Sequence, residues 1–417
     1  MVRAYFTHFQ QLSNNDKVFL IGNAIQGMGL SIYALLFNLY LKELGYGESA
    51  IGTMISTTSL GISVMAIPVA LIVEKFHMKH LVVTGLLLSS IFYFTQIFFI
   101  DEASLFAFGL LASMFQALFN ISVSPFYMRN SRPDERVYLF SLNSALNMAA
   151  LMVGYFIGGF FPEMIHAIVP GLSKIEGFRY SIMGALSLVL LSNLLFTKIK
   201  RVPIPKVRKR FFDGLKEKDW NILSKLILPK LCFAFGGGLT VPFINLYLKE
   251  KFLLSTQMIG IAYALLQFFI FVGVFITPVI IKKTTQLRFI LLTSLFSIPF
   301  MVGMGLTGNI SLVLGCFFMR GMLMNMSSPI TSMFEMERVR EKECVFASAV
   351  ILFFYHLVYT ASTRLGGVLI EKYSFGPTFY ISGACYGLAV ALYYYYFKKD
   401  SVSREEEEVV TVLKEAA

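Results

Sequence analysis

The sequence predicts an all-α membrane protein made of two pseudo-symmetric six-helix bundles, and three observations carry this prediction. Hydrophobic residues are 56% of the 417 and charged residues only 15%, a balance too apolar for a water-soluble protein of this length. Twelve apolar runs are each long enough to cross a bilayer as a helix. Finally, landmarks of the first six runs recur in the same order in the last six.

The twelve runs lie between polar breaks and are helix-length rather than strand-length. In chain order they are 18–41, 50–73, 81–100, 104–128, 137–161, 178–197, 222–248, 257–281, 287–307, 310–334, 345–370 and 376–397. A cytoplasmic N-terminus places most of the 36 lysines and arginines inside, as the positive-inside rule requires. We therefore expect a multi-pass protein of the cell membrane with both termini in the cytoplasm.

The net charge of +11 reflects this topology and an attraction to anionic headgroups of the lipid bilayer, so no nucleic-acid partner is predicted. The four cysteines show no paired spacing, so neither a disulfide framework nor a metal site is expected. No phosphate-binding loop is present. We expect no metal, no cofactor and no direct use of ATP.

The longest polar break separates the sixth run from the seventh and is strongly basic. We therefore divide the chain into an N-terminal six-helix half (1–197), a basic cytoplasmic linker (198–221), a C-terminal six-helix half (222–397) and a charged cytoplasmic tail (398–417). The hexapeptide Asn-Leu-Tyr-Leu-Lys-Glu at 38–43 recurs at 245–250. Two related halves place a binding site near the membrane midplane, between them.

Twelve spans arranged as six plus six, a basic central loop and cytoplasmic termini make the chain similar to the major facilitator superfamily. In that family the loop between spans two and three carries an acidic residue among bases and glycines. Here the stretch 70–79 keeps the acid Glu74 and the bases Lys75 and Lys79, but loses both glycines. The resemblance implies a cytoplasmic latch in which Glu74 pairs with Arg129; the alternative is a solvated charge cluster at a helix end.

Span five ends in a glycine-rich stretch, 154–159, which is similar to a motif of the family's antiporters. Tyr155 stands where those proteins have proline. Small residues at this spacing permit close helix contact in any membrane protein. The motif favours export over uptake.

The resemblance also implies that spans one, four, seven and ten line a central cavity, and these spans carry polar side chains at membrane depth. The candidate substrate-binding residues are Gln26, Tyr33, Asn38, Gln116, Asn120, Asn245, Arg320 and Asn325. The repeat puts Arg320 opposite Gln116, which predicts an asymmetric cavity with a net positive charge.

Arg320 requires a compensating interaction, because placing a guanidinium at mid-membrane costs at least about 2.5 kcal/mol of free energy. Its fork suits a carboxylate or phosphate of a substrate. Alternatively, it caps backbone carbonyls or pairs with a distant carboxylate of the protein. The two alternatives stay open from the sequence.

No aspartate or glutamate lies deep within any of the twelve runs, which argues against a proton-coupled mechanism based on a buried carboxylate. The remaining titratable candidate for carrying protons is His356 in span eleven. A buried imidazole that only hydrogen-bonds a neighbour is the alternative.

The sequence thus predicts a monomeric secondary active transporter that moves a small organic solute, anionic or amphipathic, by alternating access. Export is favoured, and protons are a candidate coupling ion. A flippase for an anionic lipid or a lipid-linked sugar is the alternative within transport. A non-transporting membrane receptor or scaffold is the alternative from another class. An enzyme is not predicted, because no cluster of Asp, His, Ser or Cys lies at one depth.

Overall fold

The computed structural model describes residues 12–72, 76–131, 136–200, 220–340 and 343–415. Within these ranges the chain is helical throughout its ordered elements and contains no strand. Eleven of the described helical segments are long and apolar enough to cross a membrane. The twelfth predicted run, 376–397, forms the first part of the last helix. The predicted all-α fold class is confirmed.

The first half contains six long helices. They are α2 (Asn14–Glu43), α3 (Glu48–Ile72), α4 (Met78–Phe98), α5 (Glu102–Asn130), α6 (Arg136–Ile168) and α7 (Lys174–Thr197). Helix α2 packs against α6 and α7, while α4 and α5 pack against each other. Several helices begin where a short polar side chain accepts a hydrogen bond from the first turn, as at Asp101 and Ser173.

The second half repeats this plan with two broken spans. Its elements are α8 (Trp220–Thr240), the 3₁₀ turn η1 (Val241–Phe243), α9 (Ile244–Phe252), α10 (Thr256–Ile281), α11 (Gln286–Leu306), α12 (Ile310–Met326), α13 (Ser328–Glu337), α14 (Cys344–Tyr373) and α15 (Gly376–Glu415). Span seven consists of α8, η1 and α9, and span ten consists of α12 and α13. Pro242 and Pro329 sit at the two breaks, because proline lacks the backbone N–H that a continuous helix uses.

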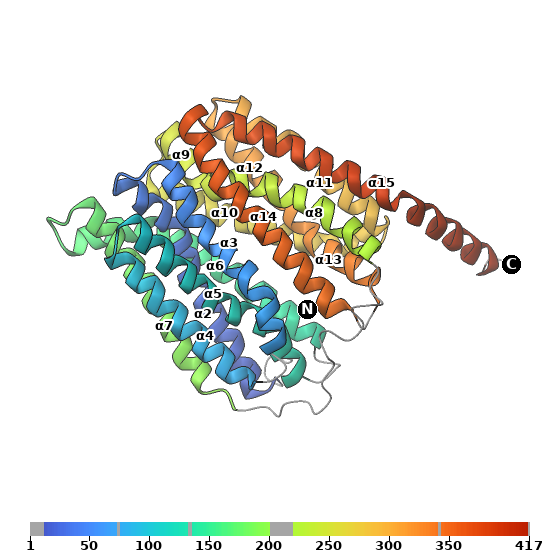
Figure 1. Cartoon of the computed structure of the whole chain (residues 1–417), viewed down its shortest axis with the longest axis horizontal. Helices are drawn as coiled ribbons and strands as arrows, with labels where there is room; N and C mark the ends of the chain where they lie inside the picture. The colour runs from blue at the N-terminus through green and yellow to red at the C-terminus, as the bar shows by residue number, and fades with distance from the viewer. Residues whose placement is uncertain (1–11, 73–75, 132–135, 201–219, 341–342, 416–417) are drawn as a thin grey trace.

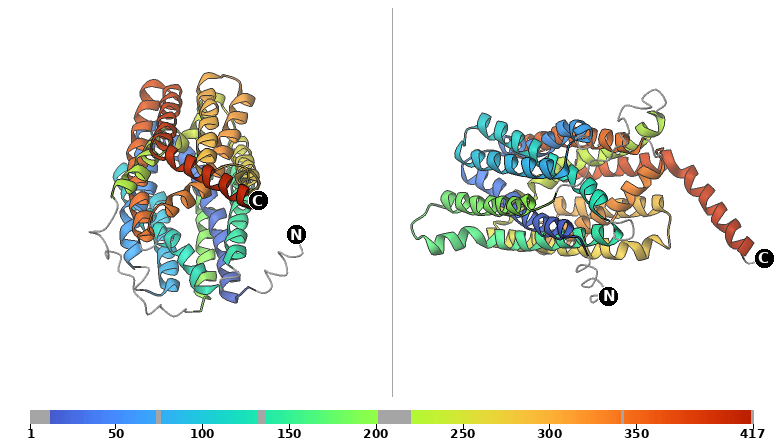
Figure 2. Two further views of the ribbon diagram at one scale, coloured as in Figure 1. Left: turned by 90° about the vertical axis from the view of Figure 1, so that its right-hand side faces the viewer. Right: turned by 90° about the horizontal axis from the view of Figure 1, so that it is seen from below.

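The two halves lie side by side, α2–α7 in blue to green and α8–α15 in yellow-green to red (Figure 1). They meet along two helix pairs, α3 with α14 and α6 with α10. Helix α15 continues past the predicted span and its C-terminal part extends away from the bundle (Figure 2).

Two glycine pairs show how the halves are related. In α6, Gly158 packs on Ile32 of α2, while a Cβ on Gly159 would lie 2.9 Å from the Cα of Gly260 in α10. In α14, Gly366 packs on α8 and Gly367 packs on the start of α3. Each pair therefore joins the first helix of its own half to the second helix of the other half. The contacts repeat with the sequence, which confirms the predicted pseudo-symmetry.

Candidate functional site

A cavity of about 600 Å³ lies between the two halves. Helices α2, α3, α4, α5 and α6 line it from the first half, and η1, α9, α10 and α14 line it from the second. None of the described residues of α12 lines it. A cavity therefore lies between the halves, as expected, but no described residue of span ten lines it.

Aromatic hydroxyls dominate this central cavity. The tyrosines in its wall are Tyr33, Tyr93, Tyr155, Tyr263, Tyr355 and Tyr359. Amides and small hydroxyls occupy most of the other polar positions, and no described lining residue is Asp, Glu, Lys or Arg. The wall therefore presents flat apolar surface and hydrogen-bonding groups without a formal charge. These lining residues do not give the cavity the net positive charge that the sequence predicted.

The candidate residues of the first half divide into two groups. Tyr33, Gln116 and Asn120 line the cavity. The hydroxyl of Tyr33 donates to Oε1 of Gln96 at 2.9 Å, and Nε2 of Gln116 donates to Oδ1 of Asn120 at 3.1 Å. Gln26 does not line the cavity; it is buried, and its Nε2 finds no hydrogen-bond partner in the described structure.

Gln96 of α4 and the tyrosines of α6, α10 and α14 also line the cavity, although they are not among the residues predicted from the sequence. The family resemblance directed attention to spans one, four, seven and ten only. A glutamine in the apolar run 81–100 was the available signal, since amides inside a membrane span are costly unless they are paired.

Asn38 and Asn245 close one end of the cavity with reciprocal contacts. Nδ2 of Asn38 donates to Oδ1 of Asn245 at 3.0 Å and to the carbonyl of Pro242 at 2.8 Å. Nδ2 of Asn245 donates to the carbonyl of Leu35 at 3.1 Å. Each asparagine thus binds the backbone three residues before the other. The two copies of the repeated hexapeptide meet here, and we call this pair the asparagine clasp.

Charged contacts continue the closure beyond the asparagine clasp. Nζ of Lys42 forms ion pairs with Glu48 of α3 and, at 3.0 Å, with Glu250 of α9. The carboxylate of Glu371 in α14 accepts the backbone N–H of Ser49 at 2.8 Å. The Lys42–Glu250 pair and the Ser49–Glu371 hydrogen bond connect the two halves at this end of the molecule.

Arg320 lies in α12 and is 7% exposed. Its Nη2 donates to the hydroxyl of Tyr386 in α15 at 2.7 Å, and its guanidinium lies 5.6 Å from the centre of that ring. Its buried Nε has no hydrogen-bond partner among the described residues. The observed partner is a hydroxyl, neither of the partners expected from the sequence. Asn325 instead bonds to Gly321 of its own helix.

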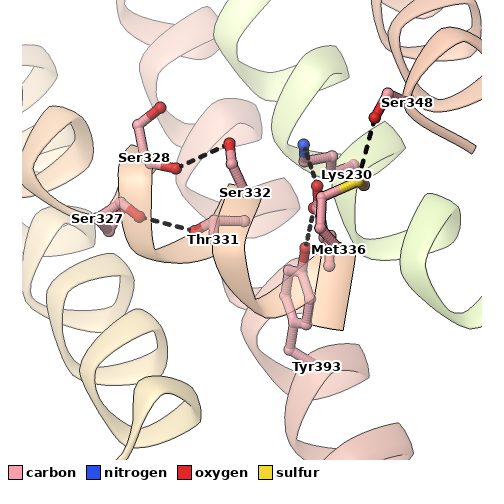
Figure 3. A network of polar contacts seen from close by, with 9 residues as sticks. Lys230, Ser327, Ser328, Thr331, Ser332, Met336, Ser348 and Tyr393 are labelled. Atoms are coloured by element: carbon pink, nitrogen blue, oxygen red, sulfur yellow. Dashed lines mark hydrogen bonds and ion pairs between the residues drawn. The ribbon is translucent and has the colours of Figure 1, made fainter. Parts of the chain in front are cut away.

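A second cavity, of about 510 Å³, lies within the second half between α8, α11, α12, α13 and α14. Figure 3 shows part of its wall, where Nζ of Lys230 in α8 lies 2.8 Å from Oε2 of Glu335 in α13. The hydroxyl of Tyr393 in α15 donates to Oε1 of Glu335 at 3.3 Å. We call this the ion-pair cavity.

Glu335 is a buried carboxylate just outside the twelve predicted runs, near the end of α13. It is one residue beyond the run 310–334, but α13 continues through it and buries it to 2% exposure. Lys230, at a comparable depth in span seven, was the signal that could have found it. A half-buried ammonium inside a span favours a carboxylate partner, and Glu335 is that partner.

His356 lines both cavities, together with its neighbour Tyr355. The imidazole packs edge-on against the Tyr355 ring, with 5.3 Å between centroids. Its buried Nδ1 has no hydrogen-bond partner in the described part of the chain. The side chain therefore stands where the central cavity and the ion-pair cavity adjoin.

The predicted cytoplasmic latch is largely outside the described structure. Glu74 and Lys75 lie outside the described residues, and of Arg129 only the backbone, at the end of α5, is described. Nζ of Lys79 donates to the carbonyl of Thr197 at 2.5 Å. The pairing of Glu74 with Arg129 stays a prediction.

No group of three or more His, Cys, Asp or Glu side chains that could hold a metal ion occurs among the described residues. The four cysteines are unpaired. Neither cavity contains a phosphate-binding loop or another recognisable cofactor site, which leaves the absence of a cofactor as a prediction.

Comparisons with known proteins agree on one family. The sequence profile of the Major Facilitator Superfamily matches residues 19–363. An MFS-type transporter of Methanocaldococcus jannaschii is 24% identical over 218 residues, which are 51% of this chain and 55% of the relative. The chain thus spans about half the length of that curated relative.

Solved structures resemble the chain over nearly its whole length. A bacterial homologue of the human lysosomal transporter Spinster, inward-facing and unoccupied, has a TM-score of 0.75 at 13% identity and covers 91% of this chain and 95% of its own. The nucleoside transporter NupG has a TM-score of 0.73 at 11% identity, covering 93% and 100%. A D-xylose-proton symporter has a TM-score of 0.70 at 13% identity, covering 91% and 96%.

These matches confirm the resemblance that the sequence suggested, and a family of transporters agrees with the expectation that the protein is not an enzyme. With a helical bundle of two related halves, a cavity between them and a profile match over most of its length, the chain belongs to the major facilitator superfamily.

Proposed function

We propose that this protein is a secondary active transporter that moves a small amphipathic organic solute across the cell membrane by alternating access. The single observation that carries the proposal is the central cavity of about 600 Å³ between the two halves, closed at one end by the asparagine clasp. A cavity of this size suits a drug-sized organic molecule.

The lining favours the amphipathic part of the substrate prediction. Six tyrosines offer ring faces for an apolar body and hydroxyls for its polar groups. An anionic group finds no cation in this wall, since Arg320 is bound to Tyr386 outside it. Of the predicted site residues, Tyr33, Asn38, Gln116, Asn120 and Asn245 are the ones that we propose contact the solute.

Alternating access requires the closed end to open. We propose that the structure is the inward-facing state, because the asparagine clasp and the Lys42–Glu250 ion pair join the halves at the end that the predicted topology places outside. Opening would exchange these contacts for a closure at the other end, where Glu74, Lys75, Lys79 and Arg129 form the proposed latch. The helix breaks at Pro242 and Pro329 are candidate hinges.

Direction, topology and assembly are proposed from the sequence. The glycine-rich stretch at 154–159 supports export, and the distribution of lysine and arginine supports cytoplasmic termini. We propose the same division into halves at 1–197 and 222–397, joined by the linker at 198–221 and followed by the tail at 398–417, and a monomer as the working unit. His356 is the proposed proton carrier of the central cavity.

The test is a reconstitution experiment. Purified protein in liposomes is screened by thermal shift against aromatic acids, amides, nucleosides and sugars, and each stabilising solute is then followed across the membrane under a proton or a solute gradient. We expect movement of at least one amphipathic solute, and slower movement after Asn245→Ala. If no solute moves under either gradient, the transport proposal loses its support and the receptor or scaffold alternative is favoured.

A flippase remains a second candidate because of an apolar groove between α6 and α10. It is lined only by apolar side chains: Met152, Val153, Phe156, Ile261, Ala264, Leu265 and Phe268. On the same two helices, Tyr155 and Tyr263 line the central cavity with 5.2 Å between their ring centroids. A lipid tail in the groove would lie beside this tyrosine pair. Transfer of a labelled anionic lipid between leaflets would favour this candidate.

A further inference from the structure

The ion-pair cavity holds an ion pair whose carboxylate is almost fully buried, while its ammonium group is partly reached by solvent. The side chain of Glu335 is 3% exposed and that of Lys230 is 23% exposed, with 2.8 Å between their charged atoms. Such a pair is stable as a neutral unit, but removing or displacing one partner leaves an uncompensated charge. Binding or protonation events in this cavity are therefore least costly when they leave its total charge at zero.

The hydrogen-bonding groups of this cavity leave Lys230 as its strongest donor. The hydroxyls of Ser327, Thr331 and Ser332 donate to backbone carbonyls of their own helical segment, as Figure 3 illustrates for the last two. Ser348 donates to the sulfur of Met336. Lys230 is also the one described lining residue with a permanent positive charge. An acidic group entering the cavity would bind there.

Glu335 competes for the same ammonium group. An anion that joins the intact pair would give the cavity a net negative charge, which burial disfavours. Taking up one proton on Glu335 removes this obstacle, because the carboxyl becomes neutral and Lys230 is released to the anion. The proton comes from the solvent that reaches the cavity, and the total charge stays at zero.

The other groups near Glu335 do not replace Lys230 in this exchange. From α15, Tyr393 donates to the carboxylate. From α14, Tyr355 and His356 line the same cavity, while α11 contributes the uncharged Ile290 and Ser294. Because Tyr355 and His356 also line the central cavity, an amphipathic solute in that cavity adjoins the ion-pair cavity.

We propose that Lys230 binds the acidic group of an amphipathic anion, and that this binding takes up one proton on Glu335. The inference rests on the proposed transport function and deepens it, since it adds an acidic group to the substrate and names Glu335 as a proton-binding residue besides His356. From the sequence, His356 is the candidate proton carrier.

The experiment measures binding to the purified full chain in lipid nanodiscs, with benzenesulfonate as the probe and uncharged benzenesulfonamide as its matched neutral counterpart. Benzenesulfonate stays ionised throughout, so any pH dependence belongs to the protein. With one proton taken up per anion, the affinity should rise about tenfold for each unit that the pH falls, above the range where Glu335 is already protonated. Benzenesulfonamide should bind with no such dependence.

Variants assign the effect to the pair. Glu335→Gln mimics the protonated carboxyl, so benzenesulfonate should bind tightly with no pH dependence. Lys230→Gln should abolish benzenesulfonate binding at every pH while benzenesulfonamide still binds. The double variant, Lys230→Gln with Glu335→Gln, leaves no unpaired charge and should fold even where a single variant does not; it should also bind only benzenesulfonamide. Glu337→Gln, on the exposed end of α13, is the matched control and should behave as the unmodified chain.

The outcomes separate the two proposals. A pH dependence that survives Glu335→Gln, or benzenesulfonate binding that survives Lys230→Gln, overturns the proton-linked anion site. Binding of benzenesulfonamide alone also overturns it but supports the proposed function, because the central cavity then accepts a neutral amphipathic solute. If neither probe binds, both proposals lose their support.

Discussion

The two halves share a scaffold but differ in their polar chemistry. In the first half, Nδ2 of Asn23 donates to Oδ1 of Asn143 at 2.8 Å, and the hydroxyl of Tyr127 donates to the same oxygen. At the matching position of the second half stands Lys230, and its network is the ion pair with Glu335, completed by the hydroxyl of Tyr393. Likewise, Gln116 in the first half corresponds to Arg320 in the second.

This difference indicates a division of roles. Neutral amide and hydroxyl networks keep the same hydrogen bonds over a wide pH range, since none of their groups titrates near neutrality. An ion pair changes its charge and its contacts when one partner is protonated. The hydrogen-bond network of the first half therefore keeps its charge as the pH changes, whereas the ion pair of the second half can respond to a proton or an anion. The following predictions test the comparison, from the largest expected effect to the smallest.

Breaking the ion pair should cost more than breaking its neutral counterpart. Lys230→Met leaves the buried Glu335 carboxylate without its ammonium partner, which we expect to destabilise the protein by about 3 kcal/mol. Asn23→Ala, the matched change in the first half, should cost about 1 kcal/mol. Thermal unfolding of both variants in detergent checks this. Equal losses would contradict the proposed difference between the halves.

The glycine contacts should show the halves behaving alike. Gly260→Val would push a side chain against Gly159, and Gly367→Val would push one against the carbonyl of Glu48. Both should destabilise the interface of the halves by about 2 kcal/mol through overpacking. The control is Gly315→Ala, where a Cβ meets no described atom within 4 Å. If only one of the two variants lost stability, the two interfaces would not be energetically equivalent, although their sequences are related.

The asparagine clasp should respond equally to changes on either side. Asn38→Ala and Asn245→Ala each remove one donor of the reciprocal pair, and each should shift the equilibrium away from the closed end by about 1 kcal/mol. Distances between spin labels placed across this end report the population of the open state. The double variant should shift it less than the two single changes added together, because the residues share a hydrogen bond.

The smallest effect on function is expected for Arg320→Gln, which installs the side chain found at the matching position of the first half. The variant loses the hydrogen bond to Tyr386, so the protein should lose about 1 kcal/mol of stability. Binding of a neutral solute in the central cavity should not change, because Arg320 is not among the residues that line it. A tenfold weaker affinity would instead assign Arg320 to the substrate site.

Part of the candidate site could be predicted from the sequence, because two of its residues lie in the repeated hexapeptide. Asn38 and Asn245 recur within the hexapeptide, and the structure places them against each other. Tyr33, Gln116 and Asn120 could be found because polar groups are rare in apolar spans. Gln96 and Tyr359 were missed because the resemblance pointed to spans one, four, seven and ten, and the sequence alone does not show that helices α4 and α14 also turn side chains toward the cavity. Glu335 was missed because a span was ended at its last apolar residue.

The sequence by itself determined the number of spans, their division into two related halves and the family, because apolar length and internal repetition survive without any knowledge of contacts. Only the tertiary structure decided which side chains meet. It put Arg320 on Tyr386, outside the central cavity, and it paired Lys230 with a carboxylate that lies beyond the predicted span. The physical reason is that burial and pairing depend on how each helix is rotated and packed against distant segments. The sequence of one helix alone does not determine that rotation or packing.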